Sequence, residues 1–153
     1  MFKVDVDSLD AYFAFDPTRR PDLTALDRAI RTSAPRLTRY FHAGTPKGEP
    51  GMRFKMIGYG PFHSASTSGM AVRWPAIGVA LQKNYISVYI PVRKNGAPLI
   101  DAYADRLNAT RTGIGNFSVE TVDQLDAAAL ADLLAETQLL FETDPNCLPN
   151  RID

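Results

Sequence analysis

The chain has 153 residues, of which 45% are hydrophobic and 22% charged, a balance that indicates one folded domain and excludes a chain that is disordered as a whole. The 17 basic and 17 acidic residues cancel, so no overall field draws the chain onto nucleic acid or an anionic membrane. No apolar run approaches the roughly 20 residues of a membrane helix, and no signal-peptide pattern opens the chain. We therefore expect a cytoplasmic protein.

The N-terminal part of the chain shows helical spacing of apolar residues. A first helix is predicted over about residues 8–15 with Asp7 as its N-cap, and a second over 21–33. Pro35 ends the second helix and favours a short third helix over 35–41. The apolar faces consist of Leu9, Tyr12 and Phe13 in the first helix and of Leu23, Leu26 and Ile30 in the second.

The middle of the chain changes to the two-residue period of β-strands. Residues 42–51 hold two prolines and three glycines and are predicted as a loop, and the alternating residues 52–59 follow as a strand. The segment 71–74 is compatible with a short strand or an edge piece, because Pro75 follows it. The strongest prediction is an antiparallel hairpin over 76–91, with a two-residue turn at Lys83-Asn84 in which Asn84 adopts positive φ.

The last third of the chain returns mainly to helical spacing. A helix is predicted from about Ala97 to 107, a short strand over 116–119, and a long helix over 125–141 capped by Asp123. The segment 142–153 is predicted as a loosely ordered polar tail. The apolar stripes are Leu99, Ile100, Tyr103, Ala104 and Leu107 in the first helix, and Leu125, Leu130, Leu133, Leu134, Leu140 and Phe141 in the last.

The order of the predicted elements indicates the fold class. Helices come first, then strands, then helices, which favours an α+β fold over an alternating α/β fold. We expect a single domain over 1–153, with its core over about 8–141. Its antiparallel sheet is expected to be backed on one face by the N-terminal and C-terminal helices, which leaves the other face open to solvent or a partner.

The familiar catalytic and cofactor motifs are missing from the sequence. No glycine-rich nucleotide-binding motif, HExxH motif or CxxC pair occurs, so no cofactor is expected. No nucleophile–base pair can be named either, and an enzymatic activity stays open without a candidate catalytic residue. The single cysteine, Cys147, cannot form an internal disulfide and has no activating basic neighbour in the sequence, so we treat it as incidental.

Acidic residues near the N-terminus suggest one alternative. Asp5, Asp7 and Asp10, with Glu120 or Asp123, could gather on one face and bind iron, because a cation relieves the repulsion between carboxylates. The competing interpretation is the ordinary acidic bias of a helix N-terminus.

The stretch GYGPFHSASTSGM, residues 58–70, is the first candidate for a ligand site. It places an aromatic pair and one of two histidines beside a run of small hydroxyl residues, between two predicted strands. The other histidine, His42, lies at a predicted helix end, where a cationic side chain is favoured without any function. The candidate ligand-binding residues are Tyr59, His63, Trp74, Lys83 and Tyr85.

Several motifs in this order resemble a known family. They are MIGYGPFH, then Trp74, then IGVALQKNYISVYI, then the spacing of Tyr103–Leu107, a glycine loop and a leucine-rich last helix. Together they resemble the family called domain of unknown function 1801, over roughly residues 8–140. The resemblance implies an α+β fold with helices behind an antiparallel sheet. One branch of that family includes a frataxin-like iron chaperone, which implies iron as an alternative ligand.

The sequence departs from this family in one segment. Many relatives carry a stretch like G-K-S-C-I-R-F after the Tyr103–Leu107 helix, whereas Gly113–Val119 here is GIGNFSV. The glycine is kept, but the lysine, cysteine and arginine have no counterparts, so no thiol or anion-binding role carries over to this segment. The matching positions elsewhere are His63, Lys83, Asn84, Tyr85 and Tyr89, to which the resemblance assigns no role.

Three hypotheses for function follow from the sequence. The first is a non-catalytic binding domain for a small anionic or aromatic metabolite, in a cleft between the Tyr59–His63 segment and the open face of the sheet. The second is an iron-binding protein like the frataxin-like branch. The third is a homo-oligomeric interaction module, in which a second copy covers the open face as a homodimer.

Overall fold

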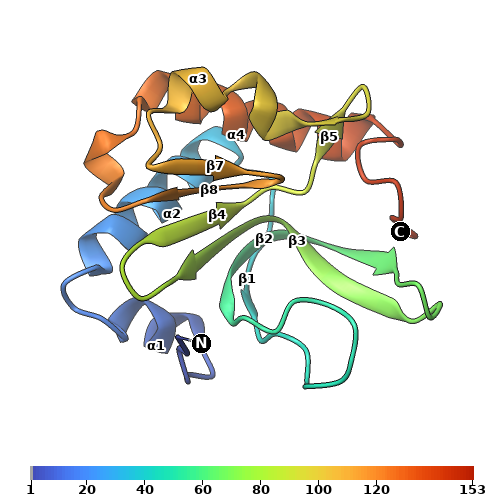
Figure 1. Cartoon of the computed structure of the whole chain (residues 1–153), viewed down its shortest axis with the longest axis horizontal. Helices are drawn as coiled ribbons and strands as arrows, with labels where there is room; N and C mark the ends of the chain where they lie inside the picture. Colours follow the sequence, from blue (N-terminus) through green and yellow to red (C-terminus); the bar gives the residue numbers. More distant parts are fainter. Residues whose placement is uncertain (1) are drawn as a thin grey trace.

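A six-stranded antiparallel sheet organises the chain, with strand order β1-β2-β3-β4-β8-β7. The computed structural model describes residues 2–153. This arrangement confirms the predicted α+β class with one antiparallel sheet (Figure 1). The strands of this sheet are β1 (Arg39–His42), β2 (Met56–Ala65), β3 (Ala71–Leu81), β4 (Ile86–Tyr89), β7 (Arg111–Gly113) and β8 (Asn116–Val119).

Helices cover one face of the sheet, as the sequence predicts (Figure 1). Within residues 2–153, no helix combines the length and the apolar character needed to cross a membrane. The helices are α1 (Leu9–Ala14), α2 (Arg20–Ser33), α3 (Ala104–Leu107) and α4 (Ala127–Thr143), with the 3-10 helices η1 (Leu99–Ala102) and η2 (Val122–Gln124). The short strands β5 (Arg93–Lys94) and β6 (Ala97–Pro98) form a separate hairpin before η1.

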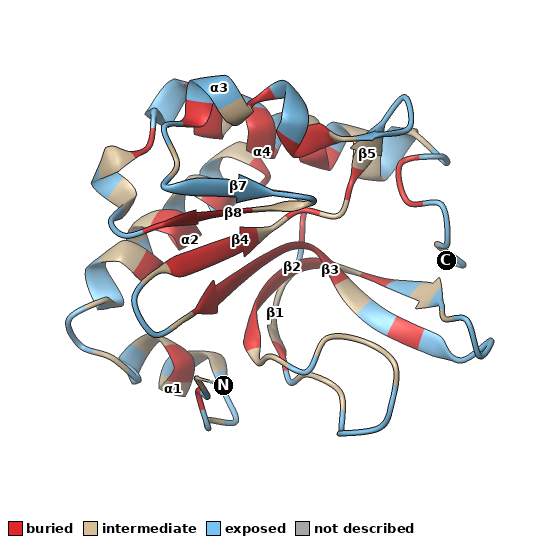
Figure 2. Ribbon diagram, viewed as in Figure 1, coloured by how far each residue is buried: buried red, intermediate tan, exposed pale blue. Residues whose placement is uncertain are grey.

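The core lies between the sheet and the helices α2 and α4. Strands β4 and β8 are buried along almost their whole length, whereas β7 and the outer ends of β2 and β3 are exposed (Figure 2). Full burial of one aliphatic side chain contributes about 1.5–3 kcal/mol, so this layer is the main source of stability. The core includes Leu23, Leu26 and Ile30 of α2, Ile77, Val79 and Leu81 of β3, Phe117 and Val119 of β8, and Leu130, Leu133 and Leu134 of α4.

The face of the sheet opposite the helices carries glycines covered by larger side chains. A Cβ atom on Gly58 would lie 2.5 Å from Cε1 of Tyr40, and a Cβ on Gly78 would collide with Sδ of Met56. Both glycines therefore leave room for a side chain of a neighbouring strand to approach the backbone closely. This face was expected to be open, but Met56 and Gly78 are buried within the chain itself.

The hairpin predicted over 76–91 is confirmed, although its turn differs from the prediction. Leu81 of β3 pairs with Ile86 of β4, and the Gln82 N–H donates to the Tyr85 carbonyl at 2.9 Å. Asn84 does not adopt the predicted positive φ, which among described non-glycine residues occurs at Asn95 and Asn108. The guanidinium of Arg19 donates to the carbonyls of Gln82 and Tyr85, at 3.1 Å for the latter. These hydrogen bonds from a residue outside the hairpin stabilise its turn.

The stretch 58–70 is a strand over residues 58–65, more than half its length, and not a loop between strands. Strand β2 begins at Met56, later than predicted, and continues to Ala65, where a short turn leads into β3. Pro61 pairs with Pro75 across the two strands, so the missing N–H groups of both prolines fall at one position of the ladder. The turn signals Gly60 and Pro61 are therefore accommodated inside a continuous pair of strands.

The predicted helix over 35–41 is wrong, because Arg39–His42 forms the edge strand β1. The aromatic residues Tyr40 and Phe41 suit a strand, and pairing with Met56–Tyr59 satisfies the backbone. The predicted helix from Ala97 is divided into η1 and α3 at Tyr103, whose φ of −115° is far from the α-helical value of about −63°.

Two predicted helix caps are shifted along the chain. Ser8, and not Asp7, caps α1, because its hydroxyl accepts from the Ala11 N–H at 3.1 Å. Asp126, and not Asp123, caps α4, because its carboxylate accepts from the Ala129 N–H at 2.8 Å. Asp123 lies in η2, one turn earlier. Each true cap is the residue that immediately precedes the first helical turn.

The predicted loosely ordered tail is wrong for most of its length. Cys147 is 1% exposed and Leu148 is 6% exposed, so both belong to the core. Burial raises the pKa of the Cys147 thiol. The segment after α4 is also hydrogen-bonded, since the Arg93 N–H donates to the Cys147 carbonyl at 2.8 Å. Residues 144–153, named here the C-terminal segment, are therefore part of the fold.

Replacement of Gly44 by alanine is expected to lower the free energy of unfolding by about 2 kcal/mol. Gly44 has φ of +78°, and a Cβ there would lie 2.5 Å from the Arg53 carbonyl oxygen. Equilibrium urea unfolding measures the loss. The matched control is Gly48→Ala in the same loop, with φ of +90° and no atom within 4 Å of the added Cβ. Equal losses in the two variants would show that close approach of the backbone to Gly44 contributes nothing.

Candidate functional site

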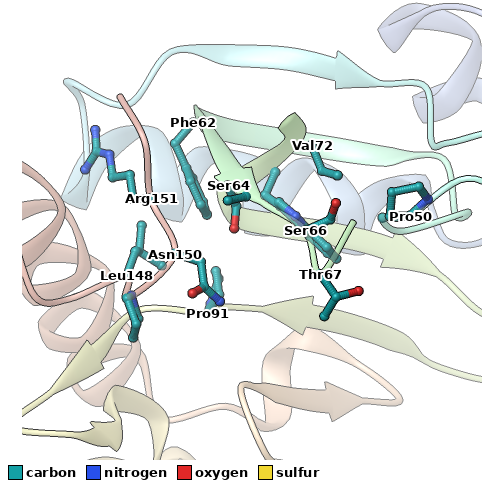
Figure 3. Close-up of a pocket in the computed structure, with 14 residues that line it drawn as sticks. Pro50, Phe62, Ser64, Ser66, Thr67, Val72, Pro91, Leu148, Asn150 and Arg151 are labelled. Atoms are coloured by element: carbon teal, nitrogen blue, oxygen red, sulfur yellow. The ribbon is translucent and has the colours of Figure 1, made fainter. Parts of the chain in front are cut away.

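A cleft of about 380 Å³ lies between the outer ends of β2 and β3 and the C-terminal segment. Figure 3 shows the side chains of Phe62, Ser64 and Asn150 around this space. We name it the β2–β3 cleft. Its lining residues are Pro50, Gly51, Phe62, Ser64, Ala65, Ser66, Thr67, Val72, Trp74, Pro91, Leu148, Pro149, Asn150 and Arg151.

The alternation of side chains along β2 changes at Gly60. As a result, the side chains after Gly60 face the cleft and the C-terminal segment. Tyr59 belongs to the core, and regular alternation would send Pro61 to the same side. Gly60 has φ of +71°, however, and after it Phe62 faces α4, with its ring 6.0 Å from that of Phe141. Trp74, the cross-strand partner of Phe62, lines the cleft with it. A glycine that tolerates the left-handed region therefore sets which side chains reach the site.

The C-terminal segment forms the opposite wall of the cleft because it pairs with the free edge of β2. Strand β1 pairs only with the first part of β2, up to Tyr59. Beyond it, the Ala65 N–H donates to the Asn150 carbonyl at 2.9 Å, and the Ile152 N–H donates to the His63 carbonyl at 3.0 Å. The cleft thus depends on contacts between residues about ninety positions apart in the chain.

The polar groups in the cleft are mainly neutral. Ser64 and Thr67 contribute hydroxyl groups and Asn150 contributes an amide, while the Ser66 hydroxyl lies 2.9 Å from that of Ser68. Phe62 and Trp74 supply aromatic surface beside them. Apolar walls with a few hydrogen-bonding groups are typical of small-molecule sites.

Arg151 lines the cleft, but its guanidinium points away from it. In Figure 3 its side chain extends on the other side of the C-terminal segment from Ser64. The guanidinium lies 4.1 Å from the ring centroid of Phe141, and Nη1 donates to the Phe141 carbonyl at 2.9 Å. Its buried Nε has no hydrogen-bond partner within residues 2–153. The positive charge is therefore used in packing and is not directed into the cleft.

The structure brings one of the five predicted site residues, Trp74, into this cleft. Tyr59 lies in the core, where its hydroxyl donates to Oδ1 of Asp27 at 2.7 Å, and burial raises its pKa. Lys83 and Tyr85 lie in the turn after β3, at the opposite end of that strand from Trp74. The sequence did not show whether Tyr59, His63 and Lys83 meet in space, and in the structure these three residues do not form one site.

His63 neighbours the cleft residues in sequence but is engaged elsewhere. Strand alternation directs it away from the side that Phe62 and Ser64 occupy. Its Nδ1 lies 2.8 Å from Oδ2 of Asp153, and its backbone N–H donates to Oδ1 at 2.9 Å. These bonds, the backbone one first, lower the pKa of the Asp153 carboxyl. The local sequence offered no acidic partner for His63, and the fold supplies one from 90 residues away.

The acidic residues considered for iron are not gathered into a site. Asp5 and Asp7 lie 3.6 and 3.4 Å from Nζ of Lys55. Asp10, Glu120 and Asp123 are not part of that group, and within residues 2–153 no set of three or more His, Cys, Asp or Glu side chains is placed to hold a metal ion.

Comparisons with known proteins add no further assignment. No family model, curated protein or solved structure matches the chain. The cleft's geometry is therefore the basis for assigning a function. What it can do chemically is hold a molecule against the aromatic surface of Phe62 and Trp74 and offer hydroxyl and amide groups to that molecule's polar atoms.

Proposed function

We propose that this protein is a non-catalytic binding domain that takes a small, mainly apolar molecule with a neutral hydrogen-bonding group in the β2–β3 cleft. The observation that carries the proposal is the combination of Phe62 and Trp74 with the hydroxyl of Ser64 and the amide of Asn150 around one 380 Å³ space. Cleft volumes of about 300–1,000 Å³ are typical of small-molecule sites.

The chemistry of the walls favours an aromatic ligand. Phe62 and Trp74 face the cleft from neighbouring strands, and Leu148 lies on the opposite wall. Aromatic side chains interact with rings in offset or edge-to-face geometry and add to the effect of apolar burial. A planar ring that carries one hydroxyl or carbonyl group would match both the apolar surface and the neutral donors and acceptors.

The same chemistry favours a neutral ligand over the anionic one considered from the sequence. The guanidinium of Arg151 is stacked on Phe141 and has Oδ1 of Asp153 at 3.8 Å from Nε, so its charge is partly balanced. Lys83, the cation that motivated the anionic hypothesis, lies at the other end of β3. The lack of a base beside Ser64 is also why the proposal is binding and not hydrolysis, because His63 faces away from it.

The Trp74→Ala variant is expected to bind p-cresol at least about tenfold more weakly than the unaltered chain, because it loses an aromatic wall of the cleft. The phenol ring and single hydroxyl of p-cresol make it a probe for the proposed chemistry. Ligand-detected saturation-transfer NMR measures the dissociation constant even when binding is weak. The Ser64→Ala variant should show a smaller loss, because it removes one hydrogen bond.

Control variants distinguish binding in the β2–β3 cleft from binding near Lys83 and Tyr85, which the sequence predicted as site residues. Lys83→Ala and Tyr85→Phe alter exposed or half-buried residues outside the cleft and should leave p-cresol binding unchanged. Benzoate, which has the same ring with a negative charge, should bind more weakly than p-cresol. The proposal is contradicted if Trp74→Ala binds p-cresol as the unaltered chain does, or if Lys83→Ala has the larger effect.

A further inference from the structure

A second cavity, of about 290 Å³, adjoins the β2–β3 cleft. Trp74 and Pro91 line both spaces, and Gly51 of the cleft is followed directly in the chain by Met52 of the second cavity. We name this second space the β3-edge cavity. Because the two spaces share two of their walls, a molecule held in the β2–β3 cleft lies next to the β3-edge cavity.

The β3-edge cavity exists because β3 and the chain after β4 separate. The pairing of β3 with β4 ends at Gly78, so Trp74 lies beyond it. The chain after β4 then follows the turn between β7 and β8, because the Ile90 N–H donates to the Gly115 carbonyl at 2.8 Å. The outer part of β3 therefore has β2 on one side and faces Pro91 across the cavity on the other.

The walls of the β3-edge cavity are mainly apolar. Among the described residues of its lining, Arg93 is the only charged one, and its Nη2 donates to the Gly96 carbonyl at 2.7 Å. Ile114, in the turn between β7 and β8, is 85% exposed although it is large and apolar. An apolar group in the cavity would cover surface that water now contacts, which is favourable. The other apolar walls are Met52, Met56, Pro75 and Pro98.

The polar and apolar walls lie in different parts of the combined space. Ser64 and Asn150 line the β2–β3 cleft and not the β3-edge cavity, whereas Ile114 lines only the latter. A water molecule occupies about 30 Å³ in the liquid, so the β3-edge cavity has room for a chain of several carbon atoms. The arrangement matches a molecule that is polar at one end and apolar at the other.

We propose that one ligand occupies both spaces, with a phenol-like ring in the β2–β3 cleft and an uncharged apolar tail that passes Trp74 and Pro91 into the β3-edge cavity. The inference rests on the function proposed for the cleft and names the class of its ligand. That class is an aromatic ring with one neutral polar group and, on the opposite side of the ring, an alkyl or similar apolar chain.

The test compares p-cresol with 4-n-butylphenol, which has the same ring and hydroxyl group and a longer tail. Burial of each additional methylene should raise the affinity about three- to fourfold, so 4-n-butylphenol should bind at least about tenfold more tightly. In ¹H–¹⁵N spectra both ligands should shift the indole resonance of Trp74. The amide resonances of Ile114 and Gly115 should shift with 4-n-butylphenol and stay fixed with p-cresol.

The Ile114→Ser variant reports on the tail separately from the ring. Ile114 is exposed and lies outside the β2–β3 cleft, so this variant should fold and bind p-cresol as the unaltered chain does. Its affinity for 4-n-butylphenol should fall about threefold or more, because the tail loses an apolar contact. The matched control is Leu139→Ser on α4, since Leu139 is 54% exposed and lines neither space. This control should leave the binding of both ligands unchanged.

The outcomes distinguish this inference from the function on which it rests. The inference is overturned if 4-n-butylphenol binds no more tightly than p-cresol, or if Ile114→Ser and Leu139→Ser affect its binding equally. In both cases p-cresol still binds beside Trp74, and the function proposed for the cleft stands. If p-cresol itself leaves the Trp74 indole resonance fixed, the proposed function is wrong and this inference is overturned with it.

Discussion

The Leu148→Ala variant is expected to lose about 3 kcal/mol of unfolding free energy and to lose measurable binding of p-cresol in the β2–β3 cleft. Leu148 is 6% exposed and belongs to both the core and the wall of the cleft. Removal of the leucine side chain leaves a cavity under the C-terminal segment. The hydrogen bonds between this segment and β2 then lose the packing beneath them. Equilibrium urea unfolding, with an unchanged dependence on denaturant, measures the stability loss.

Ile152→Ala is the matched control in the same segment. Ile152 is 59% exposed, so its replacement should change stability by less than about 0.5 kcal/mol. The Ile152 N–H still donates to the His63 carbonyl in this variant, because the bond is made by the backbone. If Leu148→Ala were as stable as Ile152→Ala, the C-terminal segment would not be docked and the cleft would lack its second wall.

The Asp27→Ala variant is expected to lose about 3–5 kcal/mol, the largest effect of any single replacement considered for this protein. Asp27 is 8% exposed, accepts from the Tyr59 hydroxyl at 2.7 Å, and lies 2.9 Å from Nη1 of Arg39. Arg31 approaches the same carboxylate at 3.6 Å. Removal of the carboxylate leaves a buried phenol without an acceptor and two guanidinium groups without their shared counterion.

A double-mutant cycle tests whether Tyr59 and Asp27 act as a pair. Tyr59→Phe alone should cost about 1–2 kcal/mol, because one buried hydrogen bond is lost. In the double variant no phenol is left unpaired, so its loss should be smaller than the sum of the two single losses. Asp132→Ala, which removes an exposed ion pair to Arg106, should leave stability nearly unchanged. Additive losses for Tyr59 and Asp27 would contradict the pairing.

This pair also shows why one predicted site residue belongs to the core. Tyr59 carries an apolar ring and a polar tip, and from sequence alone that combination suits a ligand site as well as a buried hydrogen bond. The choice depends on Asp27, which lies 32 positions earlier on α2. The hydrophobic spacing of α2 predicts the helix but gives no sign that its one buried acid faces a tyrosine of β2.

The parts of the fold that depend on local spacing were predicted well. The hairpin over 76–91, the helix Arg20–Ser33 and the strand Asn116–Val119 follow from strong two-residue or helical periods. Where local signals compete, prediction failed. Pro35 is a helix starter, but the chain needs an edge strand at Arg39–His42, and tertiary pairing with β2 decides the outcome.

The candidate site was predicted in part, because half of it is local in sequence. The run of small hydroxyl residues after His63 and the side chain of Trp74 both reach the β2–β3 cleft. The other wall comes from the segment 144–153, whose polar composition indicated a loose tail. Its docking depends on the pairing of Ser64 with Arg151 and on the burial of Leu148, and neither contact leaves a periodic signal in the sequence.

The most direct test of the account is a ¹H–¹⁵N correlation spectrum of the intact chain titrated with p-cresol. The chain has one tryptophan, so a single indole N–H resonance reports on Trp74. The account predicts that this resonance and the amides of Ser64, Val72 and Asn150 shift together with one dissociation constant. If these resonances stay fixed while those of Lys83 and Tyr85 move, the β2–β3 cleft is not the binding site.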